Sequence, residues 1–348
     1  MDFLKFGLGA TAAVGIIAAL PTASMAQERT LTAVTGLQQT NILAQAYLEK
    51  FVKALNVAGK GVLQIKYMGG QEVVPPTKAA AALKRGQFDM LSSPTAYYIG
   101  TVPEGYALTA SNQGPRQIRA NGGWELLQKV YEEKAGAYLL SWGASMTSYN
   151  TYLWKEPKIG SDGVLDLTGY KMRATGTYRP LFRALGATTI NIKSSEVITA
   201  VQRGTVDGYG FTDVSLPSIG LHTVTKYRVQ PNFYQSNTVE TMNLATWKAM
   251  TKAQKDLLTK VGTEFETSSV LFIEAERKRE EVIIKKVGIK DVVLKGDGAA
   301  KYLEIAHGEI WKELKKRSQY HDQLKPLLYK PGKPSRQVDI DRKLDEKR

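Results

Sequence analysis

One segment of the chain, residues 169–208, restricts the fold more than any other part of the sequence. Residues 170–174 are typical of a short strand, and residues 195–202 place apolar side chains at helical spacing. Ser195 is a candidate N-cap for this helix, and a glycine two residues after it is a stop signal. Residues 205–211 again predict a strand. The segment therefore predicts a strand, a helix and a strand in succession, a unit typical of α/β domains.

The same alternation runs through the first half of the chain. Strands are predicted at 30–34, 62–67, 88–92 and 138–142, and helices at 41–55, 77–84 and 124–134. Such alternation indicates parallel strands. Ligands of parallel sheets bind beyond the carboxyl ends of the strands, so the loops 36–41 and 92–98 are candidate pocket walls. These loops supply Gln38, Ser93 and Tyr97 as candidate ligand contacts.

The second half of the chain adds one long helix. Residues 252–286 keep a helical pattern with no proline and one glycine, a length that is unusual for a globular domain. A helix of this length can lie across two domains. Residues 144–151 are rich in Ser, Thr, Tyr and Asn, which is typical of a polar crossing segment or of a pocket lining. A strand is predicted at 238–244, and the proline-rich, charged end of the chain predicts poor order there.

The surplus of positive charge does not indicate a nucleic-acid partner. The chain of 348 residues has a formal net charge of +14, but its basic residues are mixed with Glu along 274–286 and with Asp along 329–348. No basic and aromatic motif of the kind that binds nucleic acid accompanies the charge. We therefore predict a solvated surface with a mild attraction for anionic ligands.

The scarcity of cysteine and histidine excludes several kinds of site. The sequence contains no cysteine and three histidines, His222, His307 and His321. This composition removes disulfides, thiol nucleophiles and Cys-based metal sites. The histidines are far apart and lack a local ligand partner, and no Gly-x-Ser-x-Gly or Ser-His-Asp arrangement is present. We predict no metal, no cofactor and no catalytic residue, so the protein is not expected to be an enzyme.

The N-terminus has the pattern of a secretory signal peptide. Lys5 precedes an apolar run over residues 6–20, and small residues follow up to Ala26. An uncleaved membrane anchor is the alternative, but the run is shorter than the roughly 20 apolar residues that a membrane span needs. We predict cleavage after Ala26, a mature chain that starts at Gln27, and a periplasmic location.

Arg173 ends the first strand of the segment 169–208. A guanidinium suits a carboxylate because its planar fork can donate two parallel, charge-assisted hydrogen bonds to the two oxygens. The alternative is an arginine that closes a surface salt bridge. The place of Arg173 at a strand end, where a cleft is expected, favours the carboxylate contact.

Five stretches of the sequence, in order, resemble a known family. They are Gly69-Gly70-Gln71-Glu72, residues 82–89, Leu-Thr-Gly-Tyr-Lys-Met-Arg at 167–173, residues 196–208 and Asn-Leu-Ala-Thr-Trp at 243–247. Their order and spacing resemble the extracytoplasmic solute receptors of tripartite ATP-independent periplasmic (TRAP) transporters, the DctP family. The likeness extends over nearly the whole predicted mature chain.

The resemblance implies a periplasmic-binding-protein fold, with two α/β domains, a hinge, a cleft between the domains and a long helix that spans both. Carried over to this sequence, domain I comprises residues 27–150 and 237–277, domain II comprises residues 151–236 and 278–330, and residues 331–348 form a charged C-terminal tail. The sequence alone shows no internal repeat, so the two domains are expected to be alike in architecture only.

The resemblance also implies site residues. In the family, an arginine at the position of Arg173 holds the ligand carboxylate. Thr175 and Ser194 occupy positions that commonly line the pocket, where either hydroxyl can donate a hydrogen bond. Phe211 stands where several relatives have Asn or another polar or acidic residue. Relatives that bind sialic acid have a second arginine on the crossing segment, and residues 149–151 of this chain offer none.

Aromatic residues near the expected cleft predict the shape of the ligand. Phe211, together with Tyr97, Tyr98, Tyr149 and Tyr209 on nearby loops, indicates a pocket for an apolar or aromatic body behind the carboxylate. The alternative is that these rings belong to the core or to the surface. A sugar acid is accordingly less favoured.

The resemblance implies that the protein captures a small organic acid and delivers it to integral-membrane TRAP permease subunits, which take it up with an ion gradient. An alternative of a different class is a ligand-binding sensor that presents its closed form to a membrane signalling receptor. An exported hydrolase is a third class, and the sequence offers no catalytic arrangement for it.

Overall fold

The computed structural model of the chain describes residues 1–2, 28–145 and 147–330. The apolar run of the predicted signal peptide and its cleavage site fall on residues 3–27, and the predicted tail falls on residues 331–348. Both predictions therefore lie outside the described residues. Within the described ranges, no helix is long and apolar enough to cross a membrane.

The first sheet has five strands in the order β2-β1-β3-β12-β4. These are β1 (Arg29–Thr35), β2 (Leu63–Gly69), β3 (Met90–Pro94), β4 (Ala137–Ser141) and β12 (Thr238–Asn243). Strand β1 is parallel to β2 and β3, as the sequence predicts. Strand β12 is antiparallel to both of its neighbours, β3 and β4. The four strands of the first half of the chain therefore run in one direction, as predicted, whereas β12, for which no direction was predicted, runs against them on its return from the second half of the chain.

Helices and short turns connect and cover the strands of the first sheet. They are α1 (Ile42–Tyr47), η1 (Leu48–Val52), α2 (Lys53–Ala58), α3 (Pro76–Lys84), η2 (Thr95–Tyr97), α4 (Gly105–Ala110), α5 (Pro115–Ala120), α6 (Gly123–Ala135) and α9 (Leu244–Lys248). The helix predicted at 41–55 starts at Ile42 because the Asn41 side chain accepts a hydrogen bond from the Leu43 N–H and so caps α1.

The second sheet has six strands in the order β13-β11-β5-β10-β8-β9. These are β5 (Tyr149–Leu153), β8 (Lys171–Arg173), β9 (Thr188–Ile190), β10 (Gly208–Thr212), β11 (Tyr227–Phe233) and β13 (Lys290–Val293). A separate two-stranded ribbon consists of β6 (Lys158–Ile159) and β7 (Leu165–Asp166). Strand β8 lies between β10 and β9 and is parallel to both.

The unit predicted between residues 169 and 208 has its two strands, β8 and β10, where they were expected, but it contains more elements between them than the single predicted helix. Helix α7 (Arg179–Ala184), strand β9 and the turn η3 (Ser194–Glu196) precede the predicted helix, which is α8 (Val197–Gln202). Ser195 is not its N-cap, because the turn η3 continues to Glu196, which holds that position. A further short turn, η4 (Leu221–Val224), follows β10.

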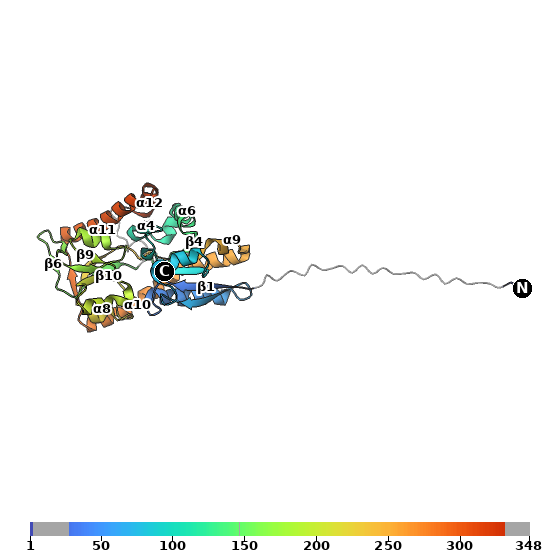
Figure 1. Cartoon of the computed structure of the whole chain (residues 1–348), viewed down its shortest axis with the longest axis horizontal. Helices are drawn as coiled ribbons and strands as arrows, with labels where there is room; N and C mark the ends of the chain where they lie inside the picture. Colours follow the sequence, from blue (N-terminus) through green and yellow to red (C-terminus); the bar gives the residue numbers. More distant parts are fainter. Residues whose placement is uncertain (3–27, 146, 331–348) are drawn as a thin grey trace, which may run out of the picture.

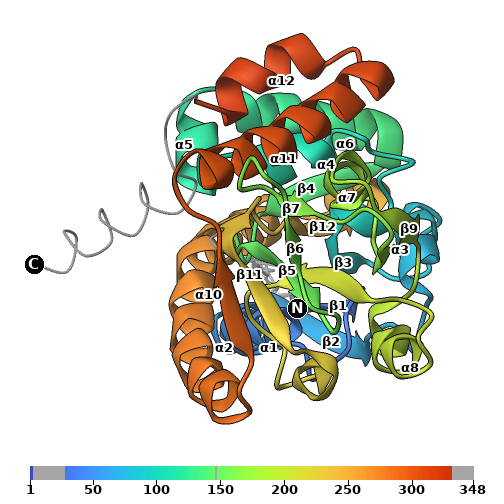
Figure 2. The same ribbon diagram turned by 90° about the vertical axis from the view of Figure 1, so that its left-hand side faces the viewer.

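Helix α10 (Lys252–Lys286) has the bounds that the sequence predicts. Thr251 accepts a hydrogen bond from the Gln254 N–H, and the Gln254 side chain accepts one from the Thr251 N–H, so a capping box starts the helix. Its N-terminal part packs against the first domain's helices. Near its C-terminal end, Glu281 Oε2 lies 2.8 Å from Nη1 of Arg228, a residue of β11. The helix therefore spans both sheets, and Figure 2 shows it along one side of the molecule.

Two further helices follow α10 and were not predicted. Helix α11 (Gly296–Arg317) packs against α4 and α7, and helix α12 (His321–Leu328) packs against α4 and α6. Figure 1 shows one lobe that carries β9, β10 and α8 and another that carries β1, β4 and α9. The two lobes correspond to the two sheets. The residue bounds of the two domains stay a prediction.

A carboxyl group lies buried at the centre of the first sheet. Glu240 of β12 is 1% exposed, and its carboxyl group accepts hydrogen bonds from the Ser92 hydroxyl at 2.9 Å, the Ser141 hydroxyl at 2.8 Å and the Gly143 N–H at 2.9 Å. Burial raises the pKa of Glu240 to about 8, although these donors oppose the rise. The nearby carboxylate of Glu266 also raises this pKa.

Candidate ligand-binding cleft

A small cavity of about 40 Å³ lies between the two sheets. Its walls come from both of them: Leu37, Asn41, Leu43, Pro94, Ala96 and Tyr97 on the first side, and Tyr149, Arg173, Thr175, Tyr178, Phe211 and Thr212 on the second. Most of these residues lie at strand ends or in the loops that follow. This is where sheets built from parallel strands bind ligands.

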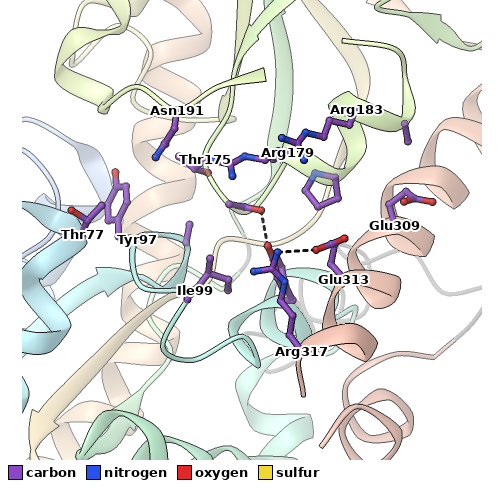
Figure 3. Close-up of a pocket in the computed structure, with 16 residues that line it drawn as sticks. Thr77, Tyr97, Ile99, Thr175, Arg179, Arg183, Asn191, Glu309, Glu313 and Arg317 are labelled. Atoms are coloured by element: carbon purple, nitrogen blue, oxygen red, sulfur yellow. Dashed lines mark hydrogen bonds and ion pairs between the residues drawn. The ribbon is translucent and has the colours of Figure 1, made fainter. Parts of the chain in front are cut away.

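Two larger cavities adjoin the small one. A cavity of about 480 Å³ shares Ala96, Tyr97 and Thr175 with it, and a cavity of about 280 Å³ shares Tyr97 and Thr175. Because the same side chains line all three, the cavities form one cleft with a narrow inner end. Figure 3 shows the largest of them, with Tyr97 and Thr175 among its walls.

Arg173 lies at the inner end of this cleft and is 1% exposed. Its Nε donates to the Ile192 carbonyl at 2.9 Å, and its Nη1 donates to the Tyr178 hydroxyl at 2.6 Å and to the Gly210 carbonyl at 3.1 Å. Among the described residues, Nη2 has no hydrogen-bond acceptor and the guanidinium has no carboxylate partner. The side chain is thus held rigidly, and Nη2 remains able to donate.

A buried charge without a counter-charge is energetically costly. An anion in the cavity would offset this cost, because it would accept hydrogen bonds from the free N–H groups of Nη2. These bonds would form in a site from which water is largely excluded. The Tyr178 hydroxyl accepts a hydrogen bond from Arg173, so its own proton is able to point elsewhere. Since Tyr178 also lines the cavity, it is a second donor for the same anion.

Two further tyrosines bring neutral hydroxyls to the cavity. Burial raises the pKa of Tyr97, although the positive charge of Arg173 acts in the opposite direction. Burial also raises the pKa of Tyr149, whose ring lies 5.6 Å from that of Tyr178. Both phenols therefore stay protonated at neutral pH and can donate hydrogen bonds.

Thr175 and Ser194 occupy neighbouring parts of the cleft. The Thr175 Oγ1 is buried and has no hydrogen-bond partner among the described residues, which leaves it available to a ligand. Ser194, in the turn η3, lines the 280 Å³ cavity together with Tyr97 and Thr175. The structure therefore brings both hydroxyls close to the cavity of Arg173.

Phe211 gives the small cavity an apolar surface. It lies in β10, opposite Asn150 of β5, and is 7% exposed. Leu37, Leu43 and Pro94 face it from the first sheet's side of the same cavity. The inner end of the cleft therefore combines one cation with an apolar wall.

Gln38 and Ser93 are not brought into the cleft. Ser93 is fully buried in β3, where its hydroxyl lies 3.4 Å from the Pro94 carbonyl. The Gln38 carbonyl accepts a hydrogen bond from the Asn41 N–H at 3.0 Å. Neither residue lines the cavities described above, whereas their neighbours Leu37 and Pro94 do. The ligand-contact roles of all eight predicted site residues stay predictions.

The expectation that the additional tyrosines lie on loops needs correction. Tyr149 and Tyr209 are strand residues, in β5 and β10. Tyr209 stacks on Tyr152 with ring centroids 5.5 Å apart, and its hydroxyl bonds to Thr225, so it belongs to a buried core cluster of the second sheet that also contains Phe211. Tyr98 is also buried in a core cluster. Tyr209 and Phe211 are two residues apart in β10 and point to the same face, but only Phe211, which is nearer the end of the strand, lines the small cavity.

Several cavity residues have no sequence signal that marks them. Leu43, Thr212 and Tyr178 line the small cavity but were not predicted, whereas Asn41 lies in the loop 36–41 that was predicted as a pocket wall. Tyr178 could have been considered, because it follows Arg173 by five residues in a segment expected to return to the cleft. Leu43 and Thr212 reach the cavity only through the packing of the first sheet against the second.

Gly210 is a glycine because Tyr178 lies against it. A Cβ atom at this position would lie 2.6 Å from the Tyr178 ring, closer than side chains approach one another. We expect Gly210→Ala to displace this ring, to weaken the binding of an acid about tenfold and to lower the unfolding free energy by about 1–3 kcal/mol. Calorimetry and thermal unfolding measure the two effects.

The matched control for this substitution is Gly308→Ala. A Cβ atom at Gly308, inside helix α11, would have no neighbour within 4 Å, so alanine is expected to leave binding unchanged and to preserve or raise stability. Wild-type affinity in Gly210→Ala would contradict the role given to the contact between Gly210 and Tyr178.

Metal-ligating side chains do not cluster in the described ranges. Over residues 28–145 and 147–330, no group of three or more His, Asp or Glu side chains is placed to hold a metal ion. At its inner end, the cleft offers hydroxyls, the Asn41 amide and one deep guanidinium as its polar groups. This donor set suits an anion better than a cation.

A sequence-family model and a known protein match most of this chain. The sequence model of the family described as bacterial extracellular solute-binding protein, family 7 (DctP), matches residues 34–317. A solute-binding protein from Albidiferax ferrireducens is 24% identical in an alignment of 284 residues that covers 76% of this chain and 80% of that protein.

Solved structures show the same fold. A TRAP transporter solute-binding protein from Bordetella bronchiseptica, with copurified calcium and picolinate in one active site, has a TM-score of 0.74 at 17% identity, over 87% of this chain and 91% of that chain. One from Rhodoferax ferrireducens, with bound malonate, has a TM-score of 0.73 at 21% identity, over 86% of this chain and 96% of that chain. With its two mixed α/β lobes, its long helix and a family match over most of its length, this chain belongs to the DctP family of solute-binding proteins of TRAP transporters.

Proposed function

We propose that this protein binds an organic carboxylate in the cleft between its two sheets, with Arg173 as the principal contact. The observation that carries the proposal is a buried guanidinium that has no carboxylate partner among the described residues and keeps Nη2 free. Tyr178 and Thr175 line the same cavity as Arg173, and their hydroxyls are further donors; the Thr175 hydroxyl has no partner among the described residues. A carboxylate is the common anion that matches such a small, donor-lined space.

The body of the ligand is expected to be apolar or aromatic. Phe211, Leu37, Leu43 and Pro94 surround the inner cavity and have no polar side-chain atoms to pair with sugar hydroxyls. Among the relatives, the Bordetella protein binds picolinate, an aromatic acid, and the Rhodoferax protein binds malonate, a short aliphatic one. The aromatic acid is the better guide for this chain because of the apolar wall.

Closure of the two domains is expected to depend on contacts across the cleft. The Tyr106 hydroxyl donates to the Gly176 carbonyl at 3.2 Å, and the Ile42 N–H donates to the Ser215 hydroxyl at 3.0 Å. A ligand that touches both sides adds to these contacts and shifts the population toward the closed state. Binding then changes the surface that the protein presents to its partner.

The partner in this proposal is the pair of integral-membrane TRAP permease subunits. The protein would be exported with cleavage after Ala26, would collect the acid in the periplasm and would deliver it for uptake driven by an ion gradient. This role requires binding and release and no chemical step, so no residue is assigned to catalysis.

The test is native mass spectrometry of the gently purified mature protein. We expect a retained small molecule, released on denaturation and identified as an organic acid. If no acid is retained, a thermal-shift screen of aliphatic and aromatic acids takes the place of mass spectrometry. We expect at least one of these acids to raise the unfolding midpoint of the protein. A protein that retains no acid and responds to none would overturn the proposal.

A further inference from the structure

The C-terminal half of helix α10 exposes both apolar and basic side chains. Val282, Ile283 and Val287 are 67%, 42% and 48% exposed, although exposed apolar side chains are usually scattered singly over a protein surface. Lysines are exposed on the same part of the helix, at Lys278, Lys285 and Lys286. Figure 2 shows α10 at the outer side of the molecule. This face of the helix is therefore not buried against the described part of the protein.

The same surface continues onto the neighbouring strands of the second sheet. Lys290, the first residue of β13, donates its N–H to the Lys226 carbonyl at 2.9 Å. The Lys226 Nζ lies 4.0 Å from the centre of the Trp154 ring, and Trp154 is 41% exposed. Beyond Trp154 the charges are mixed, because Lys155 Nζ lies 3.5 Å from a carboxylate oxygen of Asp207. We call the exposed residues of 278–290, together with Lys226 and Trp154, the lysine band.

The lysines of the band are unpaired because the acidic residues around them bond elsewhere. Each glutamate of this half of α10 has an arginine or a backbone N–H as its partner: Glu274 has Arg277, Glu276 has Arg279, Glu280 has the N–H groups of Ser215 and Ser218, and Glu281 shares Arg228 with Asp291. The lysines of the band, in contrast, make no ion pair among the described residues. The band therefore has a local excess of positive charge.

This charge indicates an anionic partner rather than a second copy of the chain. In a symmetric dimer, the same surface of each subunit meets its counterpart. The exposed valines would then pack together only by bringing unpaired lysines of the two copies against one another. Like charges at such short range repel, so a second copy does not match the band.

An anionic phospholipid surface matches both the charge and the apolar side chains of the band. Lysine can keep its ammonium group at the lipid phosphates while its methylene stem lies along apolar surface. Aliphatic side chains enter the boundary between headgroups and acyl chains, and tryptophan is favoured at that depth. Each basic residue near such a surface adds to the attraction. The band combines these three kinds of side chain on one face.

We propose that the lysine band docks the protein on an anionic phospholipid membrane, with the C-terminal half of α10 against the lipid surface. None of the cleft residues Arg173, Thr175 and Tyr178 belongs to the band. The inference is therefore independent of the ligand that the cleft binds.

The experiment measures binding of the mature protein to vesicles by sedimentation at physiological ionic strength, where distant charges are screened beyond about 8 Å. The vesicles contain equal parts of phosphatidylglycerol and phosphatidylcholine, and vesicles of phosphatidylcholine alone are the neutral reference. We expect binding to be about tenfold or more tighter on the anionic vesicles. The combined variant Lys285→Gln, Lys286→Gln and Lys290→Gln is expected to bind them about tenfold more weakly.

The control for charge is the combined variant Lys60→Gln, Lys66→Gln and Lys260→Gln. These lysines are also exposed and make no ion pair among the described residues, but they lie on the first domain. This variant loses the same net charge and is expected to bind as the wild type does. Thermal unfolding confirms that each variant is folded. Equal weakening of both combined variants would show that overall charge attracts the protein, and would refute the band as the docking surface.

The apolar part of the band has its own matched pair of variants. Val282→Gln is expected to weaken vesicle binding about threefold, whereas Val57→Gln, at a position in α2 that is 68% exposed, is expected to have no effect. Equal effects of these two substitutions would contradict contact between Val282 and the lipid.

Tryptophan fluorescence reports the contact directly, since Trp154 is the most exposed of the tryptophans. We expect its emission to shift to shorter wavelength on the anionic vesicles, and Trp154→Phe to abolish the shift. Binding without a shift, or no preference for anionic over neutral vesicles, would overturn the proposal. A wild-type protein that binds polyglutamate but not the vesicles would also overturn it, and would assign the band to an acidic protein partner.

Discussion

Replacement of Arg173 by alanine is expected to weaken the binding of the acid by more than about 2 kcal/mol, or about 30-fold. The guanidinium is buried and has no carboxylate partner among the described residues, so the ligand would be its only counter-charge there. Without it, the ligand carboxylate enters a small, largely dry cavity and loses its charged donor. Calorimetry with the acid identified by mass spectrometry, or with the best acid of the thermal-shift screen, measures the effect.

A lysine at the same position is the matched control. Arg173→Lys keeps the positive charge but cannot reproduce the bonds of Nε and Nη1 to Ile192, Tyr178 and Gly210. We expect its affinity to lie between those of the wild type and Arg173→Ala. Thermal unfolding without ligand separates a loss of binding from a loss of folding. A dissociation constant that does not change in Arg173→Ala would exclude this residue as the carboxylate contact.

The stability of the protein is expected to fall as the pH rises from about 4.5 to about 8, because of Glu240. These limits are the ordinary pKa of the carboxyl group and its value in the folded protein. Within this window the folded protein keeps a proton that the unfolded chain has released, so a higher pH favours unfolding. The contribution of Glu240 is fully present below the lower limit, and it declines by up to about 1.4 kcal/mol per pH unit across the window.

Glu240→Gln isolates this contribution. A glutamine is similar in shape, can accept the Gly143 N–H bond and does not titrate. Burial also raises the pKa of Glu280, which acts in the same direction and is retained in the variant. Urea unfolding at several pH values should therefore show a smaller decline for Glu240→Gln than for the wild type. Parallel declines in the two proteins would show that Glu240 is ionised throughout the window.

Local patterns in the sequence were sufficient to predict most elements of the fold. The extent of α10 was predicted closely, because its uninterrupted helical pattern depends on neighbours in the sequence, as does the capping box that starts the helix. The direction of β12 was not predicted, since whether a strand is parallel depends on where the chain re-enters the sheet. Helices α11 and α12 were overlooked, although Figure 2 shows them across the top of the molecule.

The candidate site was predicted unevenly for a similar reason. Arg173, Thr175, Phe211 and Tyr97 lie at the ends of strands or directly after them, and the structure places them around one cavity. Gln38 and Ser93 come from the predicted loops 36–41 and 92–98 but do not line the cleft, and Ser93 is in fact a residue of β3. The difference is one of side-chain direction, which alternates along a strand and is fixed in a loop only by tertiary contacts.

The sequence by itself determined the family, the α/β class, the long helix and the arginine at the end of β8, because each of these follows from short-range patterns or from motifs of adjacent residues. Only the tertiary structure decided that this arginine is buried without a carboxylate partner among the described residues, that Tyr178 packs on Gly210 beside it, and that Glu280 and Glu281 bond to Ser215 and Arg228 rather than to the lysines of α10. These facts depend on contacts between segments that are far apart in the chain. Burial and charge pairing are properties of the packed molecule, and no local pattern specifies them.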